Sequence, residues 1–556
     1  MTKHLFALPQ RGTLLSAMTL LMITALPNGI SAQDRHDQFD RNGLIVSRSV
    51  YDNRAANVTV GQTLPPNCVQ SSGNCVTAIA NGTYPFVFNN VTADASFGIT
   101  SRIFLDEISS SGHVMRSIEV PNSLDWWVRG KSDQLVTSFS SKSEIGLHLS
   151  TDGRYLTFMG YVAPANTVDV SNSNTPAAPD PTNPVPSSYY RAVALMDPWG
   201  HFTFTETNAY SGNNGRSAIL NNTWGNDVFY TAGNAGNGSN PQPDNIVLGA
   251  GAQILSPSWQ PEADQAPGLP TPVASFSVTE LGDKADKVGK DDNFRGMTVF
   301  NNVLYFTKGS GSNGVNTVYY VNTSDTPCAN GVGLPAQGAK LPTSPLSYSL
   351  PLPTAGLPNN MCILAGFPTT SNKTVNPVNF PFALWFADAN TLYVADEGDG
   401  YAGGTDIYTH AAAQTLAGLE KWVFNASTGT WQLAYTLTNG LNIGTPYTVS
   451  GYPTGTNTAT GLPWSPTTDG LRNITGTVNE DGSVTIYAIT STTSGGGDTG
   501  ADPDKLVVIT DNLKSTTLPA KEKFVTLRTA GFGEVLRGVS FAPSDGDGDH
   551  DRDDHK

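Results

Sequence analysis

Long apolar runs are scarce in this 556-residue chain. The longest follows Lys3 and Arg11, covers 14–26, and leads to the small residues Ser31 and Ala32. That order is typical of a secretory signal peptide, so we expect 1–32 to be removed and the protein to be secreted or periplasmic. No later stretch approaches the roughly 20 apolar residues of a transmembrane helix, which excludes a membrane span.

Basic residues are also few, because 31 Lys and Arg face 47 Asp and Glu. Removing the signal peptide with its two basic residues takes the net charge from −16 to −18. An acidic surface repels phosphate backbones and anionic lipids, so nucleic-acid partners are excluded. We expect a monomer.

Only four cysteines are present. In an oxidising compartment Cys68 can pair with Cys75, and Cys328 with Cys362, each bond closing a local loop. A metal site is the alternative, but no histidine stands near these cysteines and their spacing is unlike that of a zinc ribbon. We therefore predict two disulfides.

Helical periodicity is missing as well, and the best short candidate, 410–419, is expected to lie in a loop. The chain has instead one recurring hairpin pattern. A short apolar strand is followed by a polar turn and then by a second strand, which ends in a Gly-rich loop. The five complete copies cover 144–161, 216–234, 295–310, 382–398 and 472–490. Such repetition predicts blades.

A second hairpin of longer strands follows each copy, which gives four strands per blade. The C-terminal strand 536–543 lacks a following partner, and the N-terminal hairpin 101–120 lacks a preceding one. Together with 44–50 they would form one more blade and close the ring. We predict an all-β propeller over 33–543 with six blades, or alternatively seven, and a disordered acidic tail over 544–556.

The loops leading into the innermost strands should meet at one mouth of the central channel. They carry a mostly basic set of side chains that suggests a bound carboxylate or phosphate. The alternative is that these arginines lock neighbouring blades through carbonyls and acids. The ligand-binding candidates are Arg216, Arg295, Arg472 and Arg537, with Glu144 at the equivalent place.

Carboxylates dominate the loops that leave the second strands at the same mouth. Asp396, Glu397 and Asp399 follow one such strand, and Asp292 precedes Arg295. Hard oxygen ligands near glycines suit Ca2+, although polar turns with solvated charges would give the same pattern. His148 is the only mature-chain histidine on a predicted innermost strand, where it either packs or acts as a general base.

Two strand segments carry a family resemblance. Residues 392–398 and 536–543, with the Arg-Gly-Met-Thr stretch at 295–298, resemble blade strands of secreted bacterial and fungal propeller proteins. In architecture the chain resembles the gluconolactonase-like, strictosidine synthase-like and β-propeller phytase groups. The resemblance implies the propeller fold alone, because none of those families' catalytic residues can be matched here position by position.

Function is therefore expected from the channel mouth. One hypothesis is recognition of a small anionic or carbohydrate-like ligand, extended to hydrolysis of a lactone or phosphoester if Ca2+ acts as a Lewis acid. Asp396, Glu397 or Asp399 would then serve as ligand or base. The alternative is a structural or adhesive propeller with Trp126 and Trp127 as a contact patch.

Overall fold

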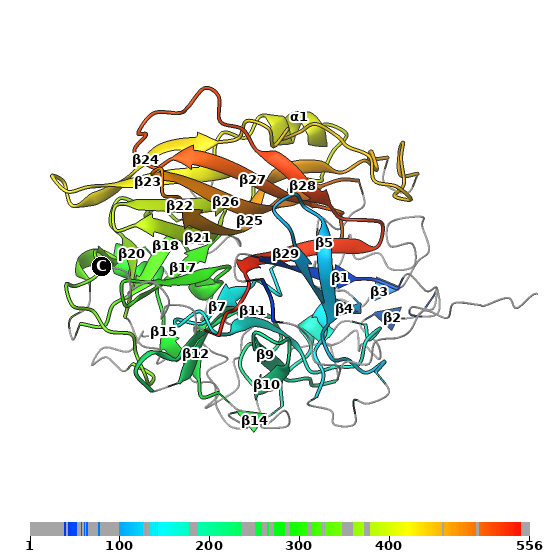
Figure 1. Cartoon of the computed structure of the whole chain (residues 1–556), viewed down its shortest axis with the longest axis horizontal. Coiled ribbons are helices and arrows are strands. Elements are labelled where there is room, and N and C mark those ends of the chain that lie inside the picture. Colours follow the sequence, from blue (N-terminus) through cyan, green and yellow to red (C-terminus); the bar gives the residue numbers. More distant parts are fainter. Residues whose placement is uncertain are drawn as a thin grey trace, which may run out of the picture. The chain divides into compact units, whose positions relative to one another are not determined.

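The fold is described from a computed structural model (Figure 1). It describes residues 38–545 except 41–42, 53–56, 58–60, 62, 65–75, 78–98, 126–127, 129–132, 140, 142, 169, 177–186, 226, 235–250, 258–263, 266–271, 284–289, 310–313, 325, 327, 347–359, 372–378, 459–460 and 496–499. The predicted signal peptide, Cys68, Cys75, the Trp126–Trp127 pair and the tail beyond Asp545 lie outside the described residues. Within the described part, no helix has the length and hydropathy needed to cross a membrane.

Six sheets are arranged as the blades of a β-propeller, which confirms the all-β class and the six-blade count (Figure 1). Each blade is built from consecutive hairpins, so its main strands pair antiparallel from the channel outward.

In channel-to-rim order, blade 1 contains β29 (Glu534–Phe541), β1 (Leu44–Val50), β4 (Thr100–Ile108) and β5 (Val114–Glu119), with β6 (Thr137–Ser138) beside β4. Blade 2 contains β7 (His148–Leu149), β8 (Leu156–Tyr161), β9 (Arg191–Met196), β10 (Phe202–Thr207) and β14 (Asp264–Gln265). Blade 3 contains β11 (Gly215–Asn221), β12 (Val228–Gly233), β13 (Ala252–Leu255) and β15 (Pro272–Ala274).

Blade 4 contains β16 (Met297–Phe300), β17 (Val303–Lys308), β18 (Thr317–Val321), β20 (Met361–Leu364) and β19 (Val332–Gly333). Blade 5 contains β21 (Pro381–Asp388), β22 (Thr391–Asp396), β23 (Gly418–Asn425) and β24 (Thr430–Leu437). Blade 6 contains β25 (Thr467–Val478), β26 (Ser483–Thr493), β27 (Lys505–Asn512) and β28 (Val525–Thr529). Two short strands, β2 (Thr63–Leu64) and β3 (Val76–Thr77), form a separate pair.

The two ends of the chain close the ring in blade 1, as predicted. The C-terminal strand β29 pairs antiparallel with β1, which aligns Leu44 with Phe541, and β1 pairs in turn with β4. A bulge interrupts the β1–β29 register between Val46 and Arg48. Closure leaves no innermost strand of this blade unpaired, which removes an aggregation-prone edge.

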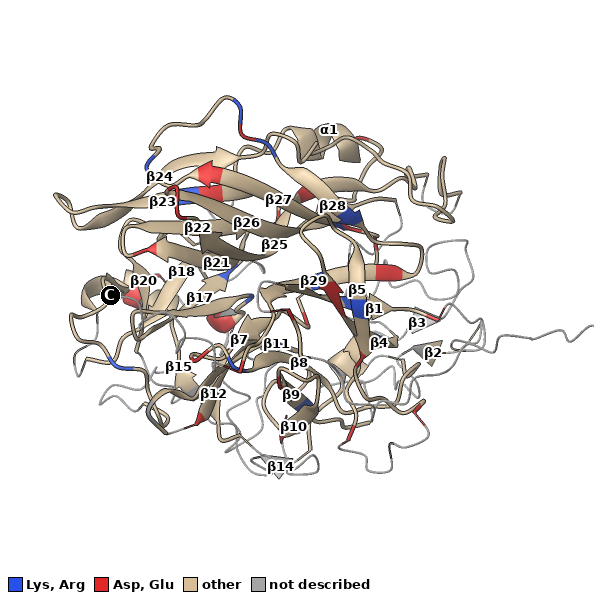
Figure 2. Cartoon of the chain, viewed as in Figure 1, with Lys and Arg blue, Asp and Glu red and all other residues tan. Residues whose placement is uncertain are grey.

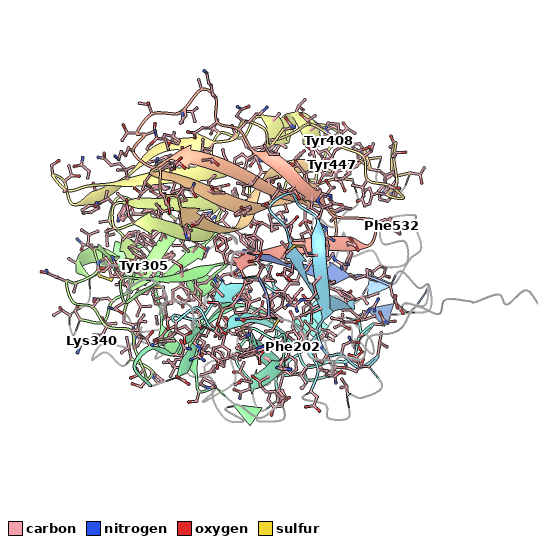
Figure 3. All side chains as sticks on the ribbon, in the orientation of Figure 1. Phe202, Tyr305, Lys340, Tyr408, Tyr447 and Phe532 are labelled. Carbon is pink, nitrogen blue, oxygen red and sulfur yellow. A yellow bond between two sulfur atoms is a disulfide. The ribbon has the colours of Figure 1, made fainter. Side chains whose placement is uncertain are left out.

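Buried apolar side chains pack between neighbouring blades, and Figure 3 draws all described side chains on the ribbon. Separate clusters join blades 1 and 2, blades 2 and 3, blades 3 to 5, blades 5 and 6, and blades 6 and 1. Figure 3 labels Phe202 in blade 2 and Tyr305 in blade 4. Each sheet therefore buries both of its faces, which explains why the inner strands are nearly continuous apolar runs.

Close approach of adjacent innermost strands depends on glycine at two Arg-Gly pairs. A Cβ at Gly296 would lie 2.3 Å from the Phe382 carbonyl oxygen, and one at Gly538 would lie 2.5 Å from the Leu147 amide nitrogen. Side-chain hydroxyl groups of one blade also donate hydrogen bonds to backbone carbonyls of the next blade. Thr157 donates to the carbonyl of Ala218, Thr307 to that of Phe382, and Ser47 to that of Ile145.

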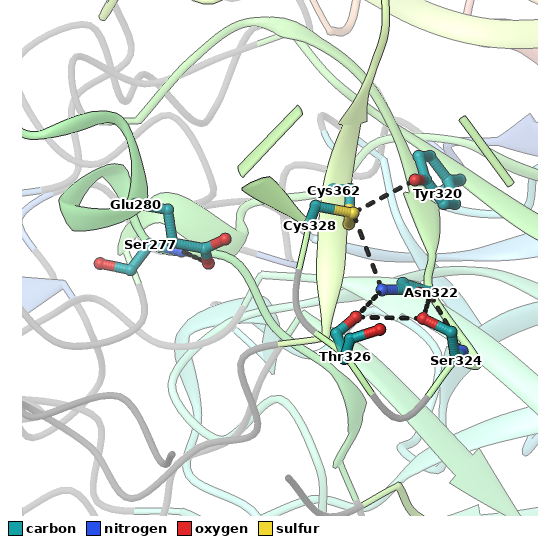
Figure 4. Close-up of a disulfide and its surroundings, with 8 residues drawn as sticks. All are labelled: Ser277, Glu280, Tyr320, Asn322, Ser324, Thr326, Cys328 and Cys362. Atoms are coloured by element: carbon teal, nitrogen blue, oxygen red, sulfur yellow. Dashed lines mark hydrogen bonds between the residues drawn. A yellow bond between two sulfur atoms is a disulfide. The ribbon is translucent and has the colours of Figure 1, made fainter. Parts of the chain in front are cut away.

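The predicted Cys328–Cys362 disulfide is present, with the two Cα atoms 6.1 Å apart (Figure 4). It ties β20 to the segment before a 3-10 turn, η6 (Ala329–Gly331). The Tyr320 hydroxyl lies 3.2 Å from Cys328 Sγ. Such bonds persist in oxidising compartments.

Helix is almost absent from the described residues. The one α-helix, α1 (Ile407–Ala412), has six residues and begins three residues before the segment that the sequence places in a loop. Ile407 and Ala411, four residues apart, are both buried, so one face of this turn packs onto the ring. Besides η6, four short 3-10 segments occur in the described residues, namely η2 (Val170–Asn172), η3 (Thr223–Gly225), η4 (Val278–Leu281) and η5 (Lys290–Asp292).

Candidate ligand-binding site at the channel mouth

Glu397 connects three blades at one end of the channel. It directly follows β22 of blade 5, and its Oε2 lies 3.3 Å from Arg472 Nε of blade 6. Its Oε1 lies 3.8 Å from Arg295 Nη2, just before β16 of blade 4. All three side chains are buried. The loop leading into β16 therefore meets the loop that leaves β22, whereas Arg472 lies inside β25 and not in the loop before it. Arg216 and Arg537, which were also expected in such loops, lie inside β11 and β29.

Arg295 also spans the mouth in the other direction. Its Nη1 donates to the Ser143 hydroxyl, in the loop before β7 of blade 2. One guanidinium on blade 4 thus contacts both blade 2 and Glu397 of blade 5. This bridging position makes Arg295 the central cation of the mouth.

Arg216 and Glu144 occupy the side of the mouth formed by blades 2 and 3. Arg216 Nη1 donates to the Phe294 carbonyl at 2.6 Å and to the Asn293 side chain. The Glu144 carboxylate accepts from the Thr137 hydroxyl at 2.7 Å and from the Tyr161 hydroxyl. Glu144 therefore supports the loop between β6 and β8, and it forms no direct ion pair with Arg216 among the described contacts.

Arg537 contacts groups of blade 1 and blade 6, as expected for a residue that links blades. Its Nη2 donates to the carbonyls of Phe139, at 2.9 Å, and Gly500, while its Nη1 lies 4.0 Å from Asp504 Oδ2. The Asp504 carboxylate also accepts from the Leu536 amide at 2.7 Å. Arg537 accordingly joins blade 1 to blade 6.

On Arg216, Arg295 and Arg472, three buried guanidinium nitrogens have no hydrogen-bond partner among the described residues. They are Nε of Arg216, Nε of Arg295 and Nη1 of Arg472. An unsatisfied buried donor costs on the order of 1–3 kcal/mol, and more when it is charged. These positions could therefore donate to an anion without breaking an existing hydrogen bond.

Positive charges lie close together at this mouth among acidic residues, and Figure 2 shows both blue and red segments near the centre of the ring. Burial lowers the pKa of Arg216 well below its ordinary value, and the neighbouring Arg295 lowers it further. Burial also lowers the pKa of Arg295, with Arg472 contributing in the same direction. A low-dielectric site strengthens this repulsion, which a bound anion would relieve.

The carboxylates proposed as calcium ligands are already engaged by protein groups. Asp396 accepts from the amides of Phe380 and Gly398, at 2.6 and 2.9 Å. Asp292 accepts from the Phe276 amide and the Ser275 hydroxyl, both at 2.9 Å.

Asp399, on the exposed side of the same loop, lies 2.7 Å from His410 Nε2 of α1. Glu397 contacts arginines, as described above. Across the described ranges, no three His, Cys, Asp or Glu side chains are grouped to hold a metal ion. Calcium binding stays a prediction.

Two further buried residues lie at the mouth: Lys308, which the sequence places where a second strand ends, and Asp504, which sequence reasoning missed. Lys308, at the end of β17, is buried and donates to the Asn316 side chain at 3.2 Å, and burial lowers its pKa to about 7. Asp504 follows the Asp-Pro pair at 502–503. The sequence signal for Lys308 is a polar residue at the end of an apolar strand, and the signal for Asp504 is an acid-rich turn. Neither signal reveals that the side chain is buried.

Burial raises the pKa of several carboxyl groups around the mouth, and this predicts pH-dependent stability. The folded-state pKa is about 6 for Asp396 and Asp502, and about 7 for Asp469 and Asp504. In the unfolded chain an Asp titrates near pH 4, roughly, so between these values only the folded protein holds the proton. The free energy of unfolding should therefore rise as pH falls from about 8 to about 5. Each group contributes on the order of 1.4 kcal/mol for every pH unit over which only the folded protein holds its proton.

Melting temperature measured by calorimetry across this pH range checks the expectation. Lys308 acts in the opposite sense only above pH 7, roughly, because there the unfolded chain holds a proton that the folded one has lost. Asp504→Asn should weaken the dependence, while the exposed Asp481→Asn should leave it intact. A melting temperature that falls steadily from pH 8 to 5, roughly, would contradict the assignment.

Comparison with known proteins gives no family for this chain. No protein-family model matches it, and no curated protein matches it. Among solved structures, an acylaminoacyl peptidase from Pyrococcus horikoshii is similar at 8% identity and a TM-score of 0.25, over 77% of this chain and 42% of that one. The chain thus spans less than half the length of that peptidase.

Two other structures are matched over most of both chains. An ulvan lyase, described as a new family of polysaccharide lyase, has 10% identity and a TM-score of 0.26, covering 91% of this chain and 97% of that one. The parainfluenza virus 5 hemagglutinin-neuraminidase ectodomain has 10% identity and a TM-score of 0.23, covering 91% of each chain. Likenesses this weak carry no argument about activity, and the six-bladed ring stands on its own strand pairing.

Proposed function

We propose that this propeller recognises a small anion, a carboxylate or a phosphate, at the channel mouth framed by Arg216, Arg295 and Arg472. The observation that carries the proposal is the set of three buried guanidinium N–H groups without hydrogen-bond partners among the described residues. Guanidinium groups bind carboxylate and phosphate oxygens through paired N–H donors. An anion placed between them would complete the hydrogen bonding that the protein leaves open.

Charge at the mouth supports the same ligand class. The positive charges of Arg216, Arg295 and Arg472 act on one another, because Arg295 lowers the pKa of Arg216 and Arg472 lowers that of Arg295. The raised pKa of Asp504, about 7, means that its negative charge weakens as pH falls. Anion affinity should therefore increase under mildly acidic conditions.

The proposal is recognition, carried out outside the cytosol. Export is supported by the apolar segment at 14–26 and by the Cys328–Cys362 disulfide, a bond typical of oxidising compartments. Hydrolysis is not included, because the candidate carboxylates Asp396, Glu397 and Asp292 are each bound by other protein groups.

The rival interpretation is that the arginines only lock blades together. Arg537 fits that role best, since its guanidinium contacts two carbonyls and lies beside Asp504. Arg295 and Arg216 combine locking contacts with open donors. Affinity and stability must therefore be measured on the same variants.

Replacing Arg295 with alanine should weaken anion binding by on the order of 1.5–3 kcal/mol, the range for a charge-assisted hydrogen bond. Arg295→Lys should recover only part of the lost anion affinity, because an ammonium group cannot supply the paired N–H donors of a guanidinium. Calorimetric titration with inorganic phosphate, sulfate and citrate measures affinity per folded molecule, and the melting temperature reports stability.

The matched control is Arg154→Ala, an exposed arginine in the β7–β8 turn. It should change neither property. If Arg295→Ala lowers the melting temperature and leaves phosphate, sulfate and citrate affinity unchanged, the arginines are locks and the proposal is wrong. Absence of binding by the unaltered protein to all three anions would have the same consequence.

A further inference from the structure

The opposite end of the channel contains a cavity of about 580 Å3. All six innermost strands or their extensions line it, with contributions from His148, Ile219, Thr298, Trp385, Thr475 and Ser540. These positions lie beyond the arginines along the same strands. Ile219, Thr298 and Thr475 come three residues after Arg216, Arg295 and Arg472, respectively, which corresponds to about 10 Å of extended strand. The cavity is therefore separate from the anion site.

Among the described residues that line this cavity there is no Asp, Glu, Lys or Arg. Its polar groups are the imidazole of His148 and several hydroxyls and amides, including those of Ser150, Thr151, Asn301 and Asn302. A charged ligand would lose its hydration there without gaining an opposite charge, which is costly. A neutral ligand with many hydroxyl groups would exchange water for donors and acceptors of the same kind.

Two partly buried aromatic residues provide the apolar part of the lining. The Trp385 ring packs against the backbone at Gly476, where a Cβ would lie 2.9 Å from the indole Cε3. Phe300 stacks on Phe386, with ring centroids 4.5 Å apart and planes 6° from parallel. Both aromatic side chains are thus held rigidly and still expose surface to the cavity. Rigid rings offer large contact area at little entropic cost.

His148 adds an unsatisfied polar atom at the same place. Its Nε2 is buried and has no hydrogen-bond partner among the described residues. Burial also lowers the pKa of this imidazole to about 4, so it is neutral at physiological pH and can either donate or accept. A ligand hydroxyl is a suitable partner for either tautomer.

The turn Asn301–Asn302 places two amides at the rim of the cavity. Both residues have positive φ, 48° and 60°, as required at the two central positions of a tight type I′ hairpin between β16 and β17. Both are exposed. Their side chains therefore remain available where a ligand would enter.

We propose that this end of the channel binds a neutral sugar, whose apolar ring face packs on Trp385 or Phe300 and whose hydroxyls bond to His148 and the surrounding amides and hydroxyls. The C–H groups of a sugar ring are attracted by the negative face of an aromatic ring. The cavity volume lies within the range of small-molecule sites, roughly 300–1,000 Å3. The sugar site and the anion site share no residue, so each can be present without the other.

The test is calorimetric titration of the full mature chain with glucose, galactose, mannose, maltose and cellobiose, and with glucuronate as a charged comparison. At least one neutral sugar should bind, and glucuronate should bind at least about tenfold more weakly than glucose if glucose is bound, since the lining offers no cation. Trp385→Ala should weaken the bound sugar's affinity by about tenfold or more. His148→Phe keeps a ring in place and should cost about three- to tenfold by removing one hydrogen bond.

The matched control is Trp199→Ala, because Trp199 is 41% exposed in the β9–β10 turn and does not line the cavity. It should leave sugar affinity unchanged. The proposal is overturned if none of the five neutral sugars binds, or if the bound sugar's affinity survives both Trp385→Ala and His148→Phe. A melting temperature for each variant ensures that affinity is compared between folded proteins.

Discussion

Glu397→Ala is expected to destabilise the protein by on the order of 3–5 kcal/mol, the cost of breaking a buried ion pair by removing one partner. The side chain is 3% exposed and is the shared acidic partner of Arg295 and Arg472. Its loss leaves two buried guanidinium groups without that carboxylate. Thermal and urea unfolding of the variant measure the change.

The same variant tests whether the mouth can accept an anion. Removing the carboxylate opens a position between two cations, so acetate or formate should bind there and raise the melting temperature of Glu397→Ala in a saturable way. The unaltered protein should respond less to these two monocarboxylates, because its own Glu397 occupies that position. Chloride at equal ionic strength controls for screening.

Glu480→Ala is the matched variant, since Glu480 is exposed in the β25–β26 turn. It should be close to neutral, with no response specific to acetate. If Glu397→Ala is as stable as the unaltered protein, the ion pairs contribute nothing. If it is unstable but insensitive to acetate and formate, the arginines do not form an anion-accepting mouth.

The fold could be predicted because each blade repeats a local pattern. An apolar strand, a turn of Asn, Asp or Gly, and a second strand specify a hairpin without reference to the rest of the chain. Closure followed from an imbalance, since 44–50, 101–120 and 536–543 lacked partners elsewhere. Their pairing as β1, β4, β5 and β29 supplied the sixth blade.

The outer strand of blade 4 was harder to predict. It is β20, at Met361–Leu364, which pairs antiparallel with β18. Long insertions separate these strands, so hairpin spacing no longer identifies the partner. The Cys328–Cys362 disulfide was the available long-range signal, because Cys362 belongs to β20.

Where the candidate residues converge could be predicted from the sequence, but which protein groups they contact there could not. That Arg295, Glu397 and Arg472 meet follows from the repeat, because equivalent positions in a closed ring face one channel. The repeat pattern does not show which carboxylates accept hydrogen bonds from other protein groups. The Asp396 carboxylate accepts a hydrogen bond from the Phe380 amide, and the Asp504 carboxylate accepts one from the Leu536 amide. Both donors are distant from their acceptors in the sequence, so these contacts depend on the tertiary fold.

The cavity at the other end could not be predicted for a related reason. Its residues are ordinary strand residues, and His148 reads from sequence as packed or catalytic because a single polar side chain carries no sign of what it faces. Six strands must converge before Thr298, Trp385 and Ser540 share one space. Sites on a closed ring are assembled from positions that are far apart in sequence.

Removing β29 should abolish cooperative folding. This strand buries Val535, Leu536 and Val539, and full burial of an apolar side chain contributes about 1.5–3 kcal/mol. Those three side chains alone approach the net stability of a typical domain, roughly 5–15 kcal/mol. A chain ending at Gly533 would also leave β1 as an unpaired edge facing the channel. Calorimetry and circular dichroism should show no sharp transition.

A synthetic peptide covering 534–543 should restore the transition by pairing with β1, since the ring is closed by strand pairing rather than by a covalent bond. The same peptide with Gly538→Ala should restore it poorly, because the added Cβ would lie 2.5 Å from the Leu147 amide nitrogen. Ser540→Ala keeps the strand and serves as the matched peptide. A chain ending at Asp545 should melt like the unaltered protein, because 546–556 contains no large apolar residue to bury. Cooperative melting of the chain ending at Gly533 without any peptide would show that β29 is dispensable, and equal rescue by both altered peptides would show that Gly538 is not needed for the close approach of blades 1 and 2.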